Sequence, residues 1–435
     1  MRAPTLRPAV LRLELVGMAL VGIVAALVPI VPSWAREAKG SSACCSHVIR
    51  VPHDARTVQQ AVDRARPGDL VLVSPGVYKE AVTVTTDRIV LRGVDRNRTV
   101  LDGEFKRDNG VKVVSAKGVA IENLTARDYT SNGFFWTGVQ GYRGSFLTAY
   151  RNGDYGIYAF DSTDGRFDHS YASGSPDSGF YIGQCFPCNA VIDHVTSENN
   201  ELGYSGTNAG GNLFIVSSTW RHNRAGIVPN SLDSEANPPQ REATLAGNLV
   251  ADNDNGDAPK SKEDAFDTVF GSGIVIVGGV GDVVTKNRVV GQQSVGIGIA
   301  PNPGIEKNVW PSRGNRVVGN VIERSGLDDL GIIVPVSDDG NCFSGNVFRT
   351  TAPADLEQLK PCQGVGVGDP AAGALDLARF LGATHPPGKP YRRTPRPPRQ
   401  PTMAHAKTAP PRPATEVFVA TVRLDAIVVP KPPGH

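Results

Sequence analysis

An all-β solenoid, in which short strands coil into stacked turns, is the fold class that the sequence predicts. Three observations support this prediction. Glycines recur at a nearly constant interval, apolar and polar residues alternate after each glycine, and no repeat contains a helical stretch of twelve residues. A repeat of about 23 residues has room for three short strands and their corners.

Each repeat is defined by a glycine that precedes an apolar-x-apolar strand. The first six glycines are 23, 23, 23, 24 and 23 residues apart, and the next three follow after 47, 23 and 35 residues. The longer intervals correspond to two turns with a loop and to one turn with an insertion. The nine positions are Gly110, Gly133, Gly156, Gly179, Gly203, Gly226, Gly273, Gly296 and Gly331.

Asparagine recurs late in the repeats. A stack of Asn side chains inside a turn would satisfy backbone groups from one turn to the next. We expect this ladder at Asn199, Asn223, Asn287, Asn320 and Asn346.

Residues 1–35 have the layout of a secretory signal peptide. Three arginines precede an apolar run from Leu15 to Val31, and Ser33-Trp34-Ala35 provides a small-residue cleavage site. The expected mature chain begins at Arg36 and is secreted or held at the cell surface, and the alternative is a retained anchor. No later segment is apolar enough to span a bilayer, so no membrane contact is predicted beyond this segment.

Residues 57–66 form the one helical stretch upstream of the repeats. Thr57 is a suitable N-cap, and Val58, Ala61, Val62 and Ala65 share one apolar face. Because a solenoid needs its open end covered, we interpret this helix as an N-terminal cap. The solenoid domain is expected over 36–384, with rungs over about 70–350 and a C-terminal cap to about 384.

The opening of the domain contains the motifs TVQQAV (57–62), PGD (67–69), VSPGVY (73–78), IVLRG (89–93) and LDG (101–103). With these motifs it resembles the right-handed parallel β-helix proteins of the pectin-lyase-like superfamily. The resemblance covers roughly residues 48–350 and implies a right-handed coil with three parallel sheets. Activity does not transfer with it, because one fold hosts many functions. The sequence lacks the Asn-Thr-Asp and Gly-His-Gly blocks of polygalacturonases and the Asp-Pro-His block of alginate epimerases.

The register of the repeats predicts one outer face that carries columns of acidic and aromatic side chains. Positions +1 and +3 after each glycine are mostly apolar and should point inward. Positions −2, 0 and +2 should then point outward, because side chains alternate along a strand. The outer face would carry an acidic column, a flat strip of glycines and an aromatic column, a combination suited to sugar rings.

The acidic column supplies the candidate catalytic residues Asp154, Asp177 and Glu201. Turns stack about 4.8 Å apart, which places Asp154 and Asp177 near the roughly 5–5.5 Å of a retaining glycosidase pair. Two like charges at this distance raise one pKa and give one acid and one base. The sequence predicts no set of metal ligands and requires no cofactor, although the acidic column also suits Ca²⁺.

The candidate substrate-binding residues belong to two further columns. Phe135, Tyr158 and Tyr181 occupy the +2 positions, and Asp161, Gln184 and Asn208 form a polar rim at +5. A structural explanation competes with this one, because Asp before Tyr-Gly or Ser-Gly is ordinary turn chemistry and aromatic stacks stabilise β-helices without a ligand. His169 and His194 fall at different offsets from their glycines, so no shared role is predicted.

Six cysteines in an exported chain favour disulfides. Cys185 and Cys188 have CxxC spacing and are predicted to form a local structural disulfide. A redox site would need a helix N-terminus, and a zinc site would need a second ligand pair. Cys342 and Cys362 bracket the end of the repeats and are a second candidate pair.

Charge is distributed unevenly along the chain. Residues 385–435 contain 13 prolines and carry a net charge of about +7, which leaves about −7 for residues 36–384. An acidic body excludes nucleic acid as an expected partner. The Pro/Arg-rich tail is predicted to be extended and largely disordered, either a solvated linker or a contact for an anionic surface.

Two functional hypotheses follow. The first is an exported, monomeric β-helix that binds extracellular polysaccharide or cell-wall glycan and processes it as a hydrolase, lyase or epimerase. The second is a noncatalytic surface or adhesion protein. The first requires the side chains of the outer face to converge in an open groove, and closure of that groove by residues 233–239 or 255–266 would exclude it.

Overall fold

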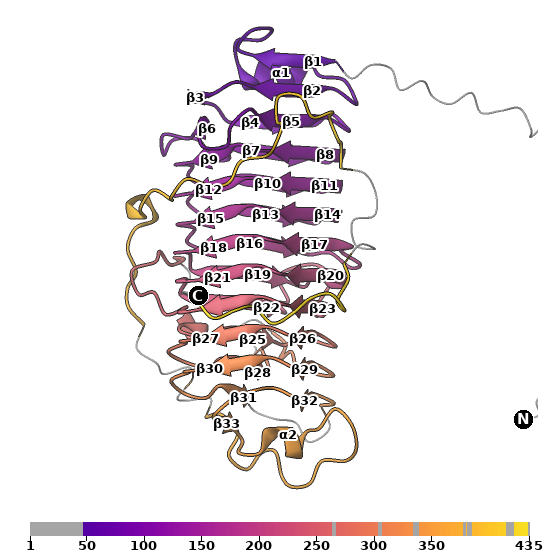
Figure 1. The fold of residues 1–435 in the computed structure, drawn as a ribbon, viewed down its shortest axis with the longest axis vertical. Coiled ribbons are helices and arrows are strands. Elements are labelled where there is room, and N and C mark those ends of the chain that lie inside the picture. The colour runs from indigo at the N-terminus through magenta and orange to yellow at the C-terminus, as the bar shows by residue number, and fades with distance from the viewer. Residues whose placement is uncertain are drawn as a thin grey trace, which may run out of the picture. The chain divides into compact units, whose positions relative to one another are not determined.

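The solenoid is built from parallel strands that coil in stacked turns (Figure 1). The computed structural model describes residues 47–262, 267–302, 307–333, 339–376, 380, 385–414 and 422–433. The expected signal segment lies outside these residues. The described strands form three parallel sheets of 12, 11 and 10 strands. The right-handed parallel β-helix predicted from the sequence, with rungs of about 23 residues, is therefore confirmed.

The three sheets are called A, B and C here. Sheet A contains β1 (Val48–Val51), β2 (Leu70–Val73), β5 (Val90–Gly93), β8 (Lys117–Glu122), β11 (Gln140–Ser145), β14 (Thr163–Asp168), β17 (Ala190–Asp193), β20 (Gly210–Val216), β23 (Arg241–Ala246), β26 (Val283–Thr285), β29 (Arg316–Val318) and β32 (Cys342–Ser344). Sheet B contains β3 (Gly76–Tyr78), β6 (Thr99–Asp102), β9 (Thr125–Arg127), β12 (Thr148–Tyr150), β15 (Tyr171–Ser173), β18 (Thr196–Glu198), β21 (Thr219–Arg221), β24 (Leu249–Ala251), β27 (Arg288–Val290) and β30 (Val321–Glu323).

Sheet C carries the predicted outer face. Its strands are β4 (Val82–Val84), β7 (Val111–Val114), β10 (Phe134–Thr137), β13 (Ile157–Phe160), β16 (Ser178–Gly183), β19 (Leu202–Thr207), β22 (Ala225–Asn230), β25 (Ile274–Val277), β28 (Ile297–Ala300), β31 (Leu330–Ile332) and β33 (Thr351–Ala352). The described helical elements are α1 (Val58–Arg64), η2 (Asp267–Val269), α2 (Leu356–Leu359) and η3 (Tyr391–Arg393).

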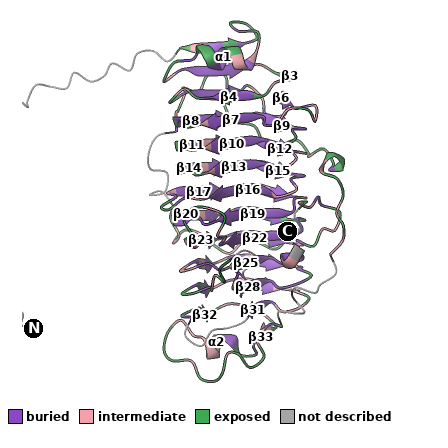
Figure 2. Ribbon diagram, turned by 180° about the vertical axis from the view of Figure 1, so that it is seen from behind, coloured by how far each residue is buried: buried purple, intermediate pink, exposed green. Residues whose placement is uncertain are grey.

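The hydrophobic core fills the inside of the coil, and buried residues follow the strands from turn to turn (Figure 2). On β10 and β13 the +1 and +3 residues Phe134, Trp136, Ile157 and Ala159 are all fully buried. Their register confirms the predicted inward columns, because Phe134 pairs with Ile157 and Trp136 with Ala159.

The glycine column has a different role from the one expected. A Cβ built on Gly133, Gly156 or Gly203 would lie 2.5–2.7 Å from the carbonyl oxygen of the column glycine in the next turn. These glycines are buried and permit close stacking of backbones, so the outer face has no flat glycine strip. The column also ends earlier than predicted, because Gly331 pairs with Gly298 and lies out of register with Gly296.

Asparagine ladders connect successive turns, as predicted. Asn287 Nδ2 donates a 2.9 Å hydrogen bond to Asn320 Oδ1, and Asn320 Nδ2 donates one of the same length to Asn346 Oδ1. A second ladder runs through Asn223, where the prediction was wrong by one residue. Asn200, not Asn199, donates to Asn223 Oδ1.

Helix α1 caps the N-terminal end of the coil. Thr57 Oγ1 accepts a 3.1 Å hydrogen bond from Gln60 N, which is the predicted N-cap. Val58, Ala61 and Val62 are buried against the first turns, so the predicted cap is confirmed.

The Pro/Arg-rich tail lies against the solenoid. Residues 385–414, called the C-terminal strap here, form no strand and contain η3 and a turn over residues 404–408 (Figure 1). Arg92 and Arg96, which are almost fully buried, donate to strap carbonyl oxygens of Ala409 and Pro401 at 2.6 and 2.9 Å. Buried guanidinium groups need hydrogen-bond acceptors, and the strap supplies some of them. The described strap is therefore packed against the first turns and is not the solvated linker that was expected. Within the described part of the chain, no helix is long and apolar enough to cross a membrane.

Candidate functional site

The predicted aromatic column exists on the outer face of sheet C. Phe135 pairs with Tyr158, and Tyr158 with Tyr181. The Phe135 and Tyr158 rings stack with centroids 4.7 Å apart and planes 11° apart, and the Tyr181 ring meets Tyr158 edge-on at 4.8 Å. Phe135 and Tyr158 are partly exposed, whereas Tyr181 is only 1% exposed.

A loop of residues 232–239, called the covering loop here, closes part of this face. Tyr181 Oη donates a 2.8 Å hydrogen bond to Glu235 Oε2. Asn208 Nδ2 donates to the carbonyl oxygens of Leu232 and Glu235, and Leu232 N donates back to Asn208 Oδ1. Tyr181 and Asn208 thus hold the covering loop in place. Their expected position on an open surface is corrected, since both are 1% exposed.

The predicted polar rim is a row of corner residues. Asp161, Gln184 and Asn208 have positive φ values of 48°, 54° and 47°, which makes them left-handed turns that end successive strands of sheet C. Asp161 is exposed, and Gln184 offers its carbonyl oxygen to Asn237 Nδ2 at 3.1 Å. None of the three lines the pocket described next.

A pocket of about 950 Å³ lies on the outer side of sheet C. Its floor comes from the corners before β10, β13 and β16 and from β19 and β22, and its cover comes from the covering loop, from residues 260–262 and from strap residues 389–392. Asp154 and Asp177 are the predicted residues that line it. This volume is near the upper end of the roughly 300–1,000 Å³ usual for ligand sites.

The two pocket acids occupy equivalent positions in adjacent turns. Asp177 N donates a 3.3 Å hydrogen bond to Asp154 O, which fixes the two residues one rung apart. Burial, followed by the negative charge of Asp154, holds the pKa of Asp177 well above its usual range. Its Oδ1 is enclosed and has no hydrogen-bond partner among the described residues. Asp177 is therefore the carboxyl group suited to carry a proton.

Glu201 belongs to the same column but not to the pocket. It is 1% exposed, and its Oε2 accepts a hydrogen bond from Ser261 N. Its charge contributes to the raised pKa of Asp177. Glu201 thus anchors the segment around residue 261, and its expected exposure on the outer face is corrected.

Tyr155 connects the aromatic column to the pocket, although the sequence did not single it out. Its ring stacks on Tyr158 at 4.2 Å with the planes 10° apart, and the residue lines the pocket beside Asp154. Burial holds the pKa of Tyr155 well above its usual range, so the phenol keeps its proton. The sequence does offer one signal, which is the aromatic residue at position −1, between the acid at −2 and the glycine. Simple alternation of side chains assigns position −1 to the inside of the coil, so it predicts no role for Tyr155 on the outer face.

Part of the pocket floor is polar. Thr207 Oγ1 donates a 3.0 Å hydrogen bond to Asn230 Oδ1, and Asn230 Nδ2 donates to Ser205 Oγ at 3.3 Å. All three side chains line the pocket. Hydroxyl and amide groups that are already ordered by one another are suited to bind the hydroxyl groups of a ligand.

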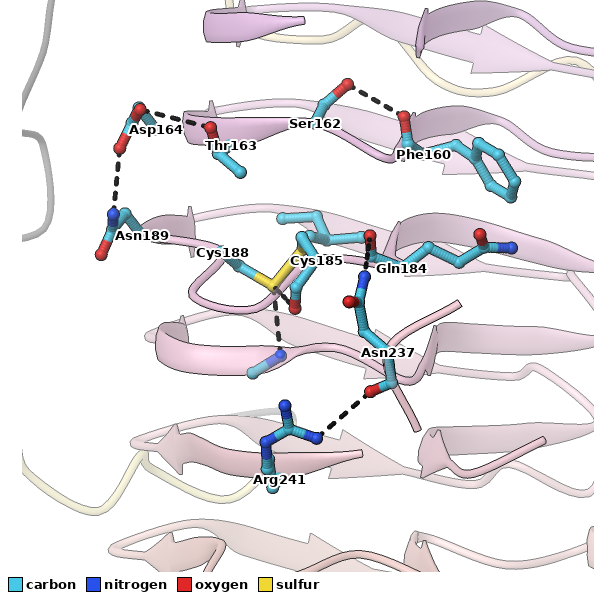
Figure 3. Close-up of a disulfide and its surroundings, with 12 residues drawn as sticks. Phe160, Ser162, Thr163, Asp164, Gln184, Cys185, Cys188, Asn189, Asn237 and Arg241 are labelled. Atoms are coloured by element: carbon cyan, nitrogen blue, oxygen red, sulfur yellow. Dashed lines mark hydrogen bonds between the residues drawn. A yellow bond between two sulfur atoms is a disulfide. The ribbon is translucent and has the colours of Figure 1, made fainter. Parts of the chain in front are cut away.

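Both candidate disulfides are present. The Cys185–Cys188 bridge lies at the corner after β16, directly after Gln184, and Gly210 N donates a 3.1 Å hydrogen bond to Cys188 Sγ (Figure 3). Both cysteines are buried, which agrees with a structural role. Cys342 and Cys362 form the second bridge at the far end of the coil.

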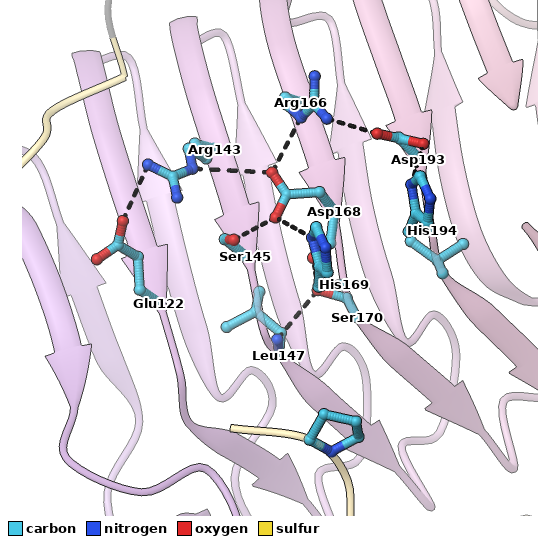
Figure 4. Close-up of polar contacts among 12 residues, drawn as sticks. Glu122, Arg143, Ser145, Leu147, Arg166, Asp168, His169, Ser170, Asp193 and His194 are labelled. Carbon is cyan, nitrogen blue, oxygen red and sulfur yellow. Dashed lines mark hydrogen bonds and ion pairs between the residues drawn. The ribbon is translucent and has the colours of Figure 1, made fainter. Parts of the chain in front are cut away.

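A second polar array lies on sheet A (Figure 4). Arg166 bridges Asp168 and Asp193 at 3.0 and 2.6 Å. His169 and His194 stack at 5.5 Å with the planes 8° apart, a contact that their offsets did not predict. Their Nδ1 atoms contact Asp168 and Asp193. The acids and bases of this array compensate one another, so it stabilises the surface of sheet A.

The described residues contain no group of three or more His, Cys, Asp or Glu side chains arranged to hold a metal ion. The acidic column of sheet C accordingly forms no such group there. Its carboxylates are divided between the pocket and the segment around residue 261.

The fold and the covered pocket define a parallel β-helix protein with a polar site on one sheet. The family model for the right-handed β-helix region matches residues 132–322. A search among curated proteins finds no match to this chain.

Similar solved structures are β-helix proteins of low sequence identity. The A-module of mannuronan C-5 epimerase AlgE4 from Azotobacter vinelandii is 13% identical, with a TM-score of 0.46 over 64% of this chain and 86% of that one. An alginate lyase from a Paenibacillus species is 13% identical, with a TM-score of 0.47 over 70% and 99%. The Dettilon tailspike protein is 14% identical, with a TM-score of 0.43 over 71% and 69%.

Proposed function

We propose that this chain binds an extracellular polysaccharide or cell-wall glycan in the sheet C pocket and hydrolyses a glycosidic bond there. The observation that carries the proposal is the pair Asp154 and Asp177, one rung apart in a covered pocket that also holds hydroxyl and amide groups. Burial and the negative charge of Asp154 raise the pKa of Asp177. A carboxyl group whose pKa is raised beside a second carboxyl group can act as the acid of an acid–base pair.

In this proposal Asp177 is the proton donor. Its carboxyl proton passes to the glycosidic oxygen as the bond between that oxygen and the anomeric carbon breaks. The carboxylate of Asp154 attacks the anomeric carbon, and water then releases the sugar while returning a proton to Asp177. Neighbouring rungs are about 4.8 Å apart, which favours the retaining mechanism over the inverting one, whose acids are about 6.5–9.5 Å apart.

Recognition of the sugar falls to the rest of the pocket. Tyr155 presents a protonated phenol on a ring that is fixed by stacking on Tyr158. Ser205, Thr207 and Asn230 provide further hydroxyl and amide groups to the pocket. An aromatic surface next to ordered polar groups matches the apolar faces and hydroxyl edges of pyranose rings.

An extracellular ligand agrees with the redox state of the chain. The two disulfides are of the kind that persists in oxidising compartments. Export itself stays a prediction that rests on residues 1–35.

Reducing-sugar release tests the proposal. The purified full chain is incubated with a panel of neutral and acidic polysaccharides, and the anomer first released is identified by NMR. We expect Asp177→Asn to lower turnover by at least about 100-fold, the usual worth of a general acid. The matched control is Asp161→Asn, which changes an exposed carboxylate outside the pocket and should leave turnover unchanged. An inverted product, or equal turnover in the two variants, would exclude the Asp154–Asp177 mechanism.

A noncatalytic surface protein is the second candidate. The specific observation in its favour is that the covering loop closes the lower part of the aromatic column through Tyr181 and Asn208. In that case the Asp154 and Asp177 substitutions alter stability alone, and no polysaccharide binds to the folded chain.

A further inference from the structure

The C-terminal strap crosses one side of the sheet C pocket. Lys389, Pro390, Tyr391 and Arg392 line the pocket together with Asp154 and Asp177, which lie more than 200 residues earlier in the chain. The strap passes along the edge of the coil between its anchoring points, as Figure 1 shows. The pocket is therefore completed by a segment that belongs to no repeat.

Anchors on both sides fix this part of the strap. On one side, Arg224, which is 2% exposed, donates a 2.9 Å hydrogen bond to Pro386 O, and Lys389 Nζ donates to Asp257 Oδ2 at 2.6 Å. On the other side, Asn97 and Gln400 exchange two hydrogen bonds, from Gln400 N to Asn97 Oδ1 at 2.8 Å and from Asn97 Nδ2 to Gln400 O at 2.9 Å.

The segment between these anchors is ordered by aromatic contacts. The Tyr391 ring meets Phe105 edge-on at 5.9 Å, and the Arg392 guanidinium lies 4.8 Å from the Phe105 ring centre. The hydroxyl oxygen of Tyr391 lies 3.1 Å from the place that a Cβ on Gly153 would occupy. Tyr391 is thus held beside the turn that carries Asp154, and the absence of a side chain at position 153 makes room for it.

We propose that Tyr391 and Arg392 of the strap are binding residues of the saccharide site, a role that rests on the function proposed above. Tyr391 offers a ring and a hydroxyl in the part of the pocket wall beside Gly153 and Asp154. Arg392 adds guanidinium donors, which bind hydroxyl or carboxylate oxygens of a sugar. A wall supplied by a tethered segment is pre-organised at a small entropic cost, because Arg224 and Asn97 hold the strap from outside the pocket.

The experiment measures binding and stability together. The full chain is screened on an array of neutral and uronic-acid oligosaccharides, and the strongest binder is titrated by calorimetry against the parent, Tyr391→Ala, Arg392→Ala and Arg393→Ala. The last variant is the matched control, since Arg393 is an exposed neighbour that does not line the pocket. We expect at least about tenfold weaker binding for the first two variants, equivalent to about 1.4 kcal/mol, and unchanged binding for the control.

Two further variants separate the possible outcomes. Asn97→Ala releases an anchor outside the pocket and should also weaken binding, and Tyr155→Ala reports on the pocket itself. Loss of binding for Tyr155→Ala with full affinity for Tyr391→Ala and Arg392→Ala would overturn the strap proposal and leave the proposed function intact. If the folded parent binds no oligosaccharide, both proposals fall. Thermal unfolding of each variant identifies any loss of binding that comes from loss of folding.

Discussion

Gln240 and Asp282 face each other inside the coil as an amide–carboxyl pair. Gln240 Nε2 donates a 2.8 Å hydrogen bond to Asp282 Oδ1, which also accepts one from Ala243 N at 2.8 Å. The other two oxygens, Gln240 Oε1 and Asp282 Oδ2, are buried and have no partner among the described residues. A proton on Asp282 Oδ2 would pair these two oxygens in a cyclic arrangement. Burial agrees with this, since it raises the pKa of Asp282 to about 7.

The first prediction concerns pH. The pKa of Asp282 is higher in the folded than in the unfolded state, so ionisation of this buried carboxyl group lowers the free energy of unfolding. This loss of stability is absent below about pH 4, grows up to about pH 7 and is constant above. Asp282→Asn keeps a donor toward Gln240 Oε1 at every pH. We therefore expect this variant to be more stable than the parent at pH 8, by about 1–3 kcal/mol, and similar to it at pH 4. Denaturant unfolding at the two pH values measures this, and an equal gain at both would contradict it.

The second prediction concerns the glycine column. A Cβ at Gly156 would lie 2.6 Å from Gly179 O, a backbone atom that cannot move aside without disturbing the next turn. Gly156→Ala should destabilise the chain by about 1–3 kcal/mol. Gly331→Ala is the control, because the nearest atoms to its Cβ are side-chain atoms 3.6 Å away. Similar melting temperatures for the two variants would show that the column tolerates side chains.

The third prediction concerns the buried ion pair between Arg92 and Glu122, whose side chains are fully buried and 2.6 Å apart. Glu122→Gln removes the charge that balances Arg92, at an expected cost of about 3–5 kcal/mol. Arg92 also donates to the strap at Ala409 O, so faster proteolysis near residue 409 should accompany the loss. Asp425→Asn, in an exposed pair with Arg423, serves as the control, and its melting temperature should equal that of the parent.

The fourth prediction concerns the covering loop. Tyr181→Phe removes the hydrogen bond to Glu235 while keeping the ring in the column. Loss of this hydrogen bond weakens the attachment of the covering loop by about 1 kcal/mol. Protease cleavage within residues 232–239 should therefore accelerate, while the free energy of global unfolding changes little. Tyr158→Phe, on a ring of the same column, should leave the cleavage rate unchanged. Equal cleavage in both variants would mean that the loop is held by Asn208 alone.

Most of the fold could be predicted from the sequence, because each repeat forms its strands from residues that are close together in the chain. Position +1 is apolar at Phe134 and Ile157 for the same reason in each turn, and the N-cap at Thr57 depends only on its own helix. The glycine column was found by its spacing but given the wrong role. Spacing does not show whether a missing side chain faces solvent or, as at Gly156, the carbonyl oxygen of the next turn.

The site was predicted less completely, because its cover comes from non-repeating segments. The acids Asp154 and Asp177 follow from the register, and both line the pocket. Tyr181, Asn208 and Glu201 obey the same register but are buried by the covering loop and by the segment around residue 261. Strap residues such as Tyr391 meet the pocket through a contact across the whole domain, and no local pattern encodes such a contact.

The anchoring of the strap has a consequence for the order in which the chain assembles. Arg92 and Arg96 belong to the first turns, yet carbonyl acceptors for their guanidinium groups come from residues 401–410. The ribosome makes these acceptors about 300 residues later. The guanidinium groups of Arg92 and Arg96 therefore lack part of their hydrogen-bond acceptors until residues 401–410 have been synthesised. The beginning of this β-helix is therefore completed by a segment that is synthesised after all of its described strands.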